Sequence, residues 1–477
     1  MSTRLLLAAG VVFLFLARTA SAQWMDIYGT KQTILGSAVA PLLMNESCMP
    51  EATDRPLDLQ DVLLQAICAN PQARQAWANV RAQAAAVGVS EAAYLPTLDV
   101  TAGIERDTLA TTYNANALGA GSITSSQNSS SRYGTLNFGW VLFDSGKRSA
   151  DLRQARQLLA AANATQDDTL QTIFFSAAQA YYDLCDAQAS LEAARATEST
   201  AHDSLADATA RHNGGAGTLS DQLQAETTYR RAVLDRVSAE GDVSGATGTL
   251  ANVMGLDANT PVKINAAEST PDNVAFTQDV NLLIDAAKSR HPKLVAARAR
   301  LEAARANVAA VRAEGRPTIS LVGSLTQNNP SYQQQPEQFP VTGSRGSTIG
   351  VQLKIPLFEG FASGYRVEQA EQQVDAEAAS LQNTELQVSL GVWKSYESLL
   401  TGTANLGTSQ DLLTVAEHSL EIARGRYREG VGTFTELLDA QAALTDARKQ
   451  RVLAISKWRT ARLRLALSLG NLGFWSQ

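Results

Sequence analysis

Two long tracts of the chain carry the apolar spacing of an α-helix and contain no proline. They run from Asp144 to His212 and from Glu359 to Arg428. Because proline is the main residue that breaks a helix interior, each tract is predicted to form one helix of about 69 residues, roughly 100 Å long. A helix of that length has to pack against other helices. The apolar and alanine positions that recur at steps of three and four are Leu152, Ala155, Leu158, Leu159 and Ala162 in the first tract, and Val367, Ala370, Val374, Ala376 and Leu381 in the second.

A glycine-rich turn follows each tract. Glycine adopts the positive φ that ends a helix and reverses the chain, so both tracts are predicted to return as antiparallel helical hairpins. A hydroxyl side chain in each turn can cap the returning helix, either Thr218 or Ser220 in the first and either Thr433 or Thr435 in the second. The predicted tip residues are Gly214, Gly217 and Thr218 in the first hairpin, and Gly430, Gly432 and Thr433 in the second.

Four segments alternate apolar and polar residues with the period of a β-strand. They cover about 97–105, 133–143, 318–326 and 347–357. Strands of about nine to eleven residues with this alternation are typical of outer-membrane barrels. The stretches inside each pair, 106–131 and 327–346, are rich in Ser, Asn, Gln and Gly and are predicted to be long extracellular loops.

The same alternation also fits an antiparallel sheet that packs one face on a soluble core. The polar loops, the duplication and the export signal described below favour the membrane interpretation. Four strands alone cannot close in a membrane, because small bacterial barrels need at least about eight. Open edges in lipid would leave backbone groups unpaired, at several kcal/mol each. We therefore expect the chain to oligomerise into one shared barrel.

The chain contains one unit twice. Pro71 and Pro96 are matched by Pro292 and Pro317 at one constant offset. Phe143 and Gly217 are matched by Phe358 and Gly432 at a second constant offset, slightly shorter than the first. Each copy reads helix, strand, loop, strand, long helix, turn, helix. The predicted organisation is a first repeat at 57–265, a linker at 266–277, a second repeat at 278–470 and a C-terminal tail at 471–477.

The N-terminus is predicted to be a cleaved secretory signal covering residues 1–22. A positive charge precedes an apolar run of about 13 residues, and small residues precede a cleavage site between Ala22 and Gln23. The alternative, a membrane anchor, would need about 20 apolar residues. No cysteine stands at the cleavage site, so no lipid anchor is expected. The tail at 23–56 has no counterpart in the second repeat, and a disulfide between Cys48 and Cys68 is possible in an oxidising compartment.

Composition excludes several classes of function. The 477 residues carry a net charge of −7, which argues against a nucleic-acid binder. The four histidines and three cysteines do not cluster, so no metal site is expected. Neither a Ser-His-Asp nor a Cys-His constellation occurs, and we expect neither enzymatic activity nor a cofactor.

Four motifs recur in order along the two repeats: Leu142–Arg148, Arg211–Thr218, Pro356–Gly360 and Arg426–Thr433. Together with the predicted helices and strands, they resemble the TolC family of outer-membrane channel-tunnels over nearly the whole mature chain. Phe358-Glu359-Gly360-Phe361 and Trp393 are similar to the branch that serves toxin export by type I secretion, the cyclolysin-type components.

The resemblance implies a mainly α fold in which each chain of a homotrimer adds four strands to a 12-stranded barrel in the outer membrane. It further implies a periplasmic tunnel of helices and a small equatorial mixed domain. A passive duct of this kind uses no cofactor; a periplasmic adaptor and an inner-membrane transporter open it and drive export. The glycine turns would be the periplasmic tips that meet the adaptor.

Acidic residues follow both tips. Asp221 matches Glu436, and Glu436 shares a helix face with Asp439, three residues on. Family members commonly carry acidic rings at this closed end, so the resemblance implies a cation-attracting constriction at these positions. The alternative is a solvated acidic face at a helix N-terminus, where the helix dipole favours carboxylates. Asp439 has Gln224 as its counterpart, so any ring is unequal between the two hairpins.

The leading functional prediction is an export duct for a protein toxin. Export of small molecules, as in drug efflux, is the first alternative. A periplasmic coiled-coil adaptor or scaffold that never spans lipid is the second, and it leaves the four alternating strands unexplained.

Overall fold

The structure is a computed structural model that describes residues 27–30, 55–114, 119, 121–265, 279–332 and 343–472. The predicted signal segment with its Ala22–Gln23 cleavage site, Cys48 and the predicted linker lie outside the described residues.

The described residues form two compact units. The strand unit is built mainly from Gln83–Leu159 and Arg300–Ala378, and the helical unit from the described parts of 55–82, 160–299 and 379–472. Among the described residues, no helix combines the length and apolarity required to cross a membrane.

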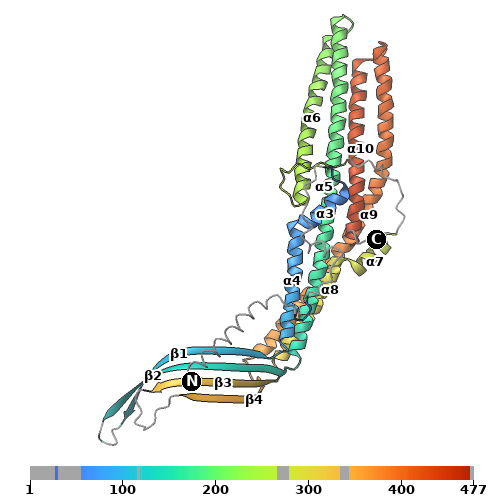
Figure 1. Ribbon diagram of the computed structural model, residues 1–477. Helices are drawn as coiled ribbons and strands as arrows, with labels where there is room; N and C mark the ends of the chain where they lie inside the picture. The colour runs from blue at the N-terminus through green and yellow to red at the C-terminus, as the bar shows by residue number, and fades with distance from the viewer. Residues whose placement is uncertain are drawn as a thin grey trace. The chain divides into compact units, whose positions relative to one another are not determined.

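The helices and strands follow the same order in the two halves of the chain (Figure 1). In the first half they are α3 (Leu59–Ala69), α4 (Pro71–Ala92), β1 (Thr97–Asn114), β2 (Ser122–Phe143), α5 (Lys147–Asn213) and α6 (Leu219–Val253). In the second half they are α7 (Val280–Arg290), α8 (Pro292–Glu314), β3 (Thr318–Tyr332), β4 (Ser344–Lys354), α9 (Ala362–Arg428) and α10 (Phe434–Ser468). The paired helices match in length: α5 and α9 both have 67 residues, and α6 and α10 both have 35.

The two long helices begin slightly later than the sequence predicts. Asp144 stands before α5, where its carboxylate accepts hydrogen bonds from the main-chain N–H groups of Gly146 (3.1 Å) and Arg148 (2.9 Å). The side chain of Arg148 in turn donates to the main-chain oxygen of Val141 at 2.7 Å. Asp144 therefore joins the strand to the helix instead of entering the helix.

The four strands form one antiparallel sheet in the order β1-β2-β3-β4. Val100 pairs with Leu136, which pairs with Leu325, so apolar residues from neighbouring strands share one face. Large side chains on this face, such as Leu98 and Ile349, are exposed. On the other face, Asn137 donates to the Asp99 carboxylate at 2.9 Å.

The strands differ in extent from the sequence prediction. The ladder between β1 and β2 extends as far as the pair Asn114 and Ser122, through much of the stretch predicted to be a loop. β4 runs from Ser344 to Lys354 and ends short of the predicted 357. The ladder persists because backbone pairing does not require apolar alternation. Thr112 and Thr124, for example, share a hydroxyl hydrogen bond of 3.0 Å across the two strands.

Small and branched side chains build the largest core of the helical unit. Leu170, Ala177 and Leu184 of α5 pack there with Val62 of α3 and Leu250 of α6. Cys185 of α5 is buried in the same core. Cys68 is disulfide-bonded.

Candidate functional site

The two helical hairpins of the helical unit end in turns with the same hydrogen-bond pattern. In the first, the N–H groups of Ala216 and Gly217 both donate to the main-chain oxygen of Arg211, at 2.9 and 3.0 Å. In the second, the N–H groups of Val431 and Gly432 both donate to the corresponding oxygen of Arg426, at 3.0 Å. The constant offset seen in the sequence therefore relates equivalent atoms in the folded chain.

Each turn contains two glycines with different roles. Gly215 and Gly430 both have φ of 73°, the left-handed conformation that ends the preceding helix. Gly217 and Gly432 are required by close approach instead. A Cβ on Gly217 would lie 3.0 Å from the Cβ of Arg211, and a Cβ on Gly432 would meet Arg426 equally closely. Gly214 is among the predicted tip residues and Gly215 is not, because a run of two glycines does not reveal which one takes the positive φ.

Of the hydroxyl side chains predicted as alternatives, Thr218 and Thr433 cap the returning helices. Thr218 Oγ1 accepts from the N–H of Asp221 at 3.1 Å, and Thr433 Oγ1 accepts from the N–H of Glu436 at 3.2 Å. The two following carboxylates differ. Asp221 also accepts from the N–H of Thr218 at 3.4 Å, which completes a capping box, whereas Glu436 lies 3.7 Å from the guanidinium of Arg426.

The two tips pack against each other through residues that are not among the predicted site residues. Phe434 and Leu437 of α10 are buried against Ala208 of α5 and Ala225 of α6. The ring of Tyr427, at the end of α9, lies 5.4 Å from that of Phe434. Apolar positions three residues apart in the first turn of a returning helix were the signal available in the sequence.

Arg211 links the two tips by two contacts. Its guanidinium lies 4.6 Å over the ring of Tyr427 and donates to the main-chain oxygen of Arg428 at 3.1 Å. The oxygen belongs to the last residue of α9, which has no N–H partner within its own helix. A side chain of the first hairpin therefore caps the long helix of the second.

The three acidic candidates occupy different surroundings. Asp221 is partly buried in its capping box, Glu436 is exposed beside Arg426, and Asp439 is exposed one turn further along α10. All three lie within the first two turns of a returning helix. A single chain brings Glu436 and Asp439 to one helix but forms no ring.

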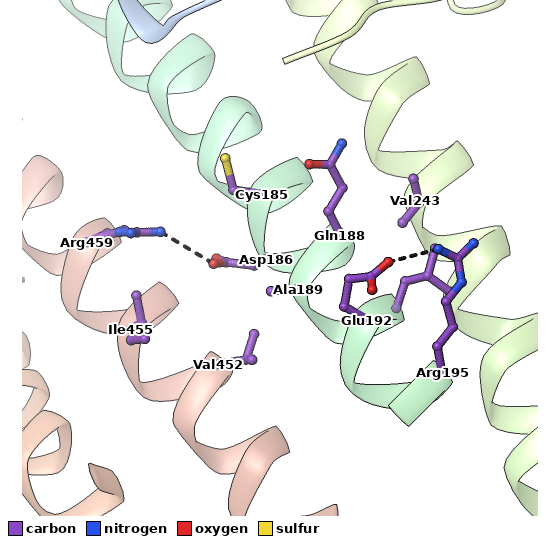
Figure 2. Close-up of a pocket in the computed structure, with 11 residues that line it drawn as sticks. Cys185, Asp186, Gln188, Ala189, Glu192, Arg195, Val243, Val452, Ile455 and Arg459 are labelled. Carbon is purple, nitrogen blue, oxygen red and sulfur yellow. Dashed lines mark hydrogen bonds and ion pairs between the residues drawn. The ribbon is translucent and has the colours of Figure 1, made fainter. Parts of the chain in front are cut away.

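A pocket of about 610 Å³ lies between α5, α6 and α10 in the helical unit (Figure 2). Its acidic side chains are matched by basic ones. Asp186 Oδ1 lies 3.7 Å from Arg459, and Glu192 accepts from Arg195 at 2.8 Å. Burial raises the pKa of Asp186, while Ser456 and Arg459 lower it. Within the described residues, no group of three or more His, Cys, Asp or Glu side chains is placed to hold a metal ion.

Residues 62–256 and 283–471 match the family model described as "Outer membrane efflux protein". The chain belongs to this outer membrane efflux protein family. Protein CyaE of Bordetella pertussis is 33% identical over 430 residues, 89% of this chain and 87% of that protein. Outer membrane protein TolC of Escherichia coli is 22% identical over 421 residues, 87% of this chain and 82% of that protein. The crystal structure of the outer membrane protein VceC from Vibrio cholerae superposes with a TM-score of 0.70 at 21% identity, over 87% of this chain and 96% of that one.

Membership in the outer membrane efflux protein family confirms the resemblance to the TolC family and the location in the outer membrane. The mainly α fold with a small antiparallel sheet is confirmed as well, because the likeness to VceC covers most of both chains. The family model matches twice, and each match falls on one half of the chain.

Proposed function

We propose that three copies of this chain form one outer-membrane duct, with a shared barrel of 12 strands. The observation that carries the proposal is the sheet. β1 and β4 each pair on one side only among the described strands, and the apolar face of the sheet is exposed. Such a sheet is suited to lipid only if its two edges are paired with further copies, since unpaired backbone groups are costly there.

The helical unit supports the same assembly. α10 packs on α5, α6 and α9, while α6 and α9 each keep exposed apolar residues. Both helices expose apolar residues whose spacings place them along one face of the helix. They are Leu219, Leu223, Leu234 and Val237 on α6, and Leu386, Leu390, Trp393, Val415 and Ile422 on α9. In a ring, α6 of one copy would cover α9 of the next.

We further propose that the duct is passive and without catalytic activity, and that a periplasmic adaptor and an inner-membrane transporter act on its tips. The tips suit a docking surface because Gly214, Thr218, Gly430 and Thr433 are exposed and their turns are held rigidly by hydrogen bonds. The proposed cargo is a protein toxin exported by type I secretion. The similarity of Phe358–Phe361 and Trp393 to the toxin-exporting branch supports this cargo, and so does the higher identity to CyaE than to TolC.

Glu436, Asp439 and Asp221 would each occur three times around the axis of the duct and form its cation-attracting constriction. Asp439 would contribute most, because the carboxylate of Glu436 is partly neutralised by Arg426 and that of Asp221 is held in its cap. Fixed carboxylates that line a narrow pore favour the entry of cations.

Conductance measurements in planar lipid bilayers test this function. The purified protein should form channels that prefer cations, and Glu436→Gln with Asp439→Asn should remove most of that preference. Asp242→Asn, which neutralises an exposed carboxylate elsewhere on α6, is the matched control and should change little. A protein that forms no channel would not be a duct, and a double variant with unchanged selectivity would rule out the acidic constriction. Secretion assays with protein and small-molecule cargo would separate toxin export from efflux.

A further inference from the structure

The two corners where a strand passes into a long helix have the same pattern of backbone hydrogen bonds. In each, two main-chain N–H groups donate to the same two carbonyl positions. The bonds run from Lys147 to Asp144 (3.1 Å) and from Ala150 to Gly146 (3.1 Å) in the first corner, and from Ala362 to Glu359 (3.1 Å) and from Tyr365 to Phe361 (3.5 Å) in the second. Positions matched by the sequence repeat are therefore equivalent in the fold. Gly146 corresponds to Phe361, and Ala150 corresponds to Tyr365.

The second corner exposes more apolar surface than the first, where the counterparts Leu142 and Phe143 are 44% and 53% exposed. Leu357 is 92% exposed, Phe358 and Phe361 are both 74% exposed, and Tyr365 is 76% exposed. We refer to these four residues as the aromatic corner. Ala150, the counterpart of Tyr365, is only 1% exposed. Contiguous apolar side chains at this level of exposure mark an interaction surface.

Backbone strain supports a role for the aromatic corner. Phe361 has φ of 65°, in the left-handed region that favours glycine, and its counterpart Gly146 has φ of 93°. The Phe361 ring stands edge to face with that of Phe358, with centroids 5.4 Å apart. A large side chain is thus held in a conformation that glycine would adopt without strain; in the first corner the non-glycine residue at positive φ is Ser145, with φ of 55°.

The first corner shows what covers such a corner. Ser145 Oγ donates to the main-chain oxygen of Pro317 at 2.9 Å, and Lys147 Nζ lies 3.4 Å from a carboxylate oxygen of Glu314. Both partners lie where α8 leads into β3. The β2–α5 corner of the first repeat is therefore covered by the α8–β3 corner of the second repeat.

The repeat supplies an equivalent of the covering corner. The segment where α4 leads into β1 corresponds to the α8–β3 corner. The N–H of Leu95 donates to the main-chain oxygen of Ala92 (3.0 Å), as the N–H of Arg316 donates to that of Ala313 (3.1 Å). β4 is the last strand of the sheet and β1 is the first, so the aromatic corner and the α4–β1 corner stand at opposite edges of one chain. We infer that the aromatic corner docks onto the α4–β1 corner of a second copy of this chain, at Tyr94 and Leu95. The inference rests on the ring assembly proposed above.

We call the contact between the β2–α5 and α8–β3 corners the within-chain seam, and the proposed contact between the aromatic corner and the α4–β1 corner the seam between copies. The side chains at the two seams differ in the way that docking requires. At the seam between copies, the polar partners of the within-chain seam are replaced by small residues: Ser145 by Gly360, Lys147 by Ala362 and Glu314 by Ala93. Tyr94 stands in place of Gly315 and Leu95 in place of Arg316; Leu95 is 53% exposed, and Tyr94 is 38% exposed although its ring lies 4.8 Å from the Arg148 guanidinium of its own chain. Chain connectivity holds the within-chain seam together, whereas association between copies depends on apolar burial.

Cross-linking tests the docking directly. In full-length protein carrying Cys185→Ala, the pair Ala93→Cys and Ala362→Cys should be joined by a short bismaleimide between copies and give covalent dimers and trimers. The matched pair Lys147→Cys and Glu314→Cys occupies the equivalent positions within one chain, so it should remain at the mass of a single chain. Ala362→Cys alone should not be joined. If the native protein is a trimer but the first pair gives no cross-link, the docking is wrong and the duct is unaffected. If the native protein is a single chain, the proposed function fails as well.

Phe361→Gly provides a second readout because it has two opposite effects. It removes the ring from the seam and also relieves the positive φ. We expect the fraction of single chains in mild detergent to rise about tenfold or more, while the folded chain keeps or gains thermal stability. The inference would be overturned if Phe361→Gly dissociated no more than the wild-type protein and brominated phospholipid quenched the fluorescence of a Phe361→Trp variant. Those two results would mean that the aromatic corner faces lipid.

Discussion

Arg211 Nη2 donates to the main-chain oxygen of Arg428 at 3.1 Å, so a side chain at the end of α5 caps the end of α9. The equivalent arginine of the second repeat, Arg426, turns instead toward its own turn, where it donates to the Val431 oxygen at 3.4 Å. Arg211 therefore connects the two hairpins and Arg426 does not.

Arg211→Ala should loosen the tips. It removes a charged hydrogen bond and a cation–π contact with Tyr427, together about 2 kcal/mol of the free energy that holds the hairpins together. If the tips close the duct, the variant should show larger and more frequent openings in single-channel recordings. Arg426→Ala is the matched control and should open less. Equal behaviour of the two variants would contradict the role assigned to Arg211.

Gly217→Ala should destabilise the first turn by about 1–3 kcal/mol, since its Cβ would press against Arg211 and the main-chain nitrogen of His212. Gly245→Ala in α6 is the control. Apart from its own helix backbone, no atom lies within 4 Å of its added Cβ, so the better helix propensity of alanine should stabilise the helix by up to about 1 kcal/mol. Hydrogen exchange of the turn amides measures both effects. Unchanged exchange in Gly217→Ala would show that the turn can open to admit a side chain.

His291 should make stability depend on pH. It is buried at the start of α8, and its Nδ1 accepts from the N–H of Lys293 at 3.2 Å. Burial, assisted by the Lys293 ammonium, lowers the pKa of His291 from 6.5 to about 4. The unfolded chain thus takes up a proton at higher pH than the folded chain does. The contribution of His291 to stability is present above about pH 6.5 and is lost as the pH falls toward 4, by up to about 3 kcal/mol.

His291→Asn should remove this dependence and keep the cap. Asn70 occupies the corresponding position before α4 and accepts from the N–H of Gln72 at 2.8 Å. Asp167, whose pKa burial raises to about 6, acts in the opposite direction: its contribution is lost as the pH rises through about 6. Because Asp167 is present in both proteins, it cancels in the comparison. Melting temperatures from pH 4 to 7 should fall less steeply in the variant; parallel curves would contradict the role of His291.

The sequence predicted the repeated architecture well because its signals are local or periodic. Absence of proline, helical spacing and glycine turns predicted α5 and α9, and alternation predicted the strands where one face is apolar. The prediction was wrong where a polar ladder continues, as between Thr112 and Thr124, because serine and threonine look the same in a loop and in a solvated strand.

The contacts between hairpins could not be predicted in the same way. Which atoms Arg211 and Tyr427 meet depends on how two hairpins from different repeats, far apart in the sequence, pack together. The exposure of the aromatic corner was equally hidden, because Phe358 and Phe361 have the composition of a core segment. The structure shows that both rings are exposed in the described part of one chain.

The central claim is that several copies share one barrel, and native mass spectrometry of the protein extracted from outer membranes in mild detergent tests it most directly. Three chains per particle are predicted, because only added copies can pair the edges of β1 and β4 and cover the apolar seams. A particle of one chain that remains folded would contradict the shared barrel and the duct with it.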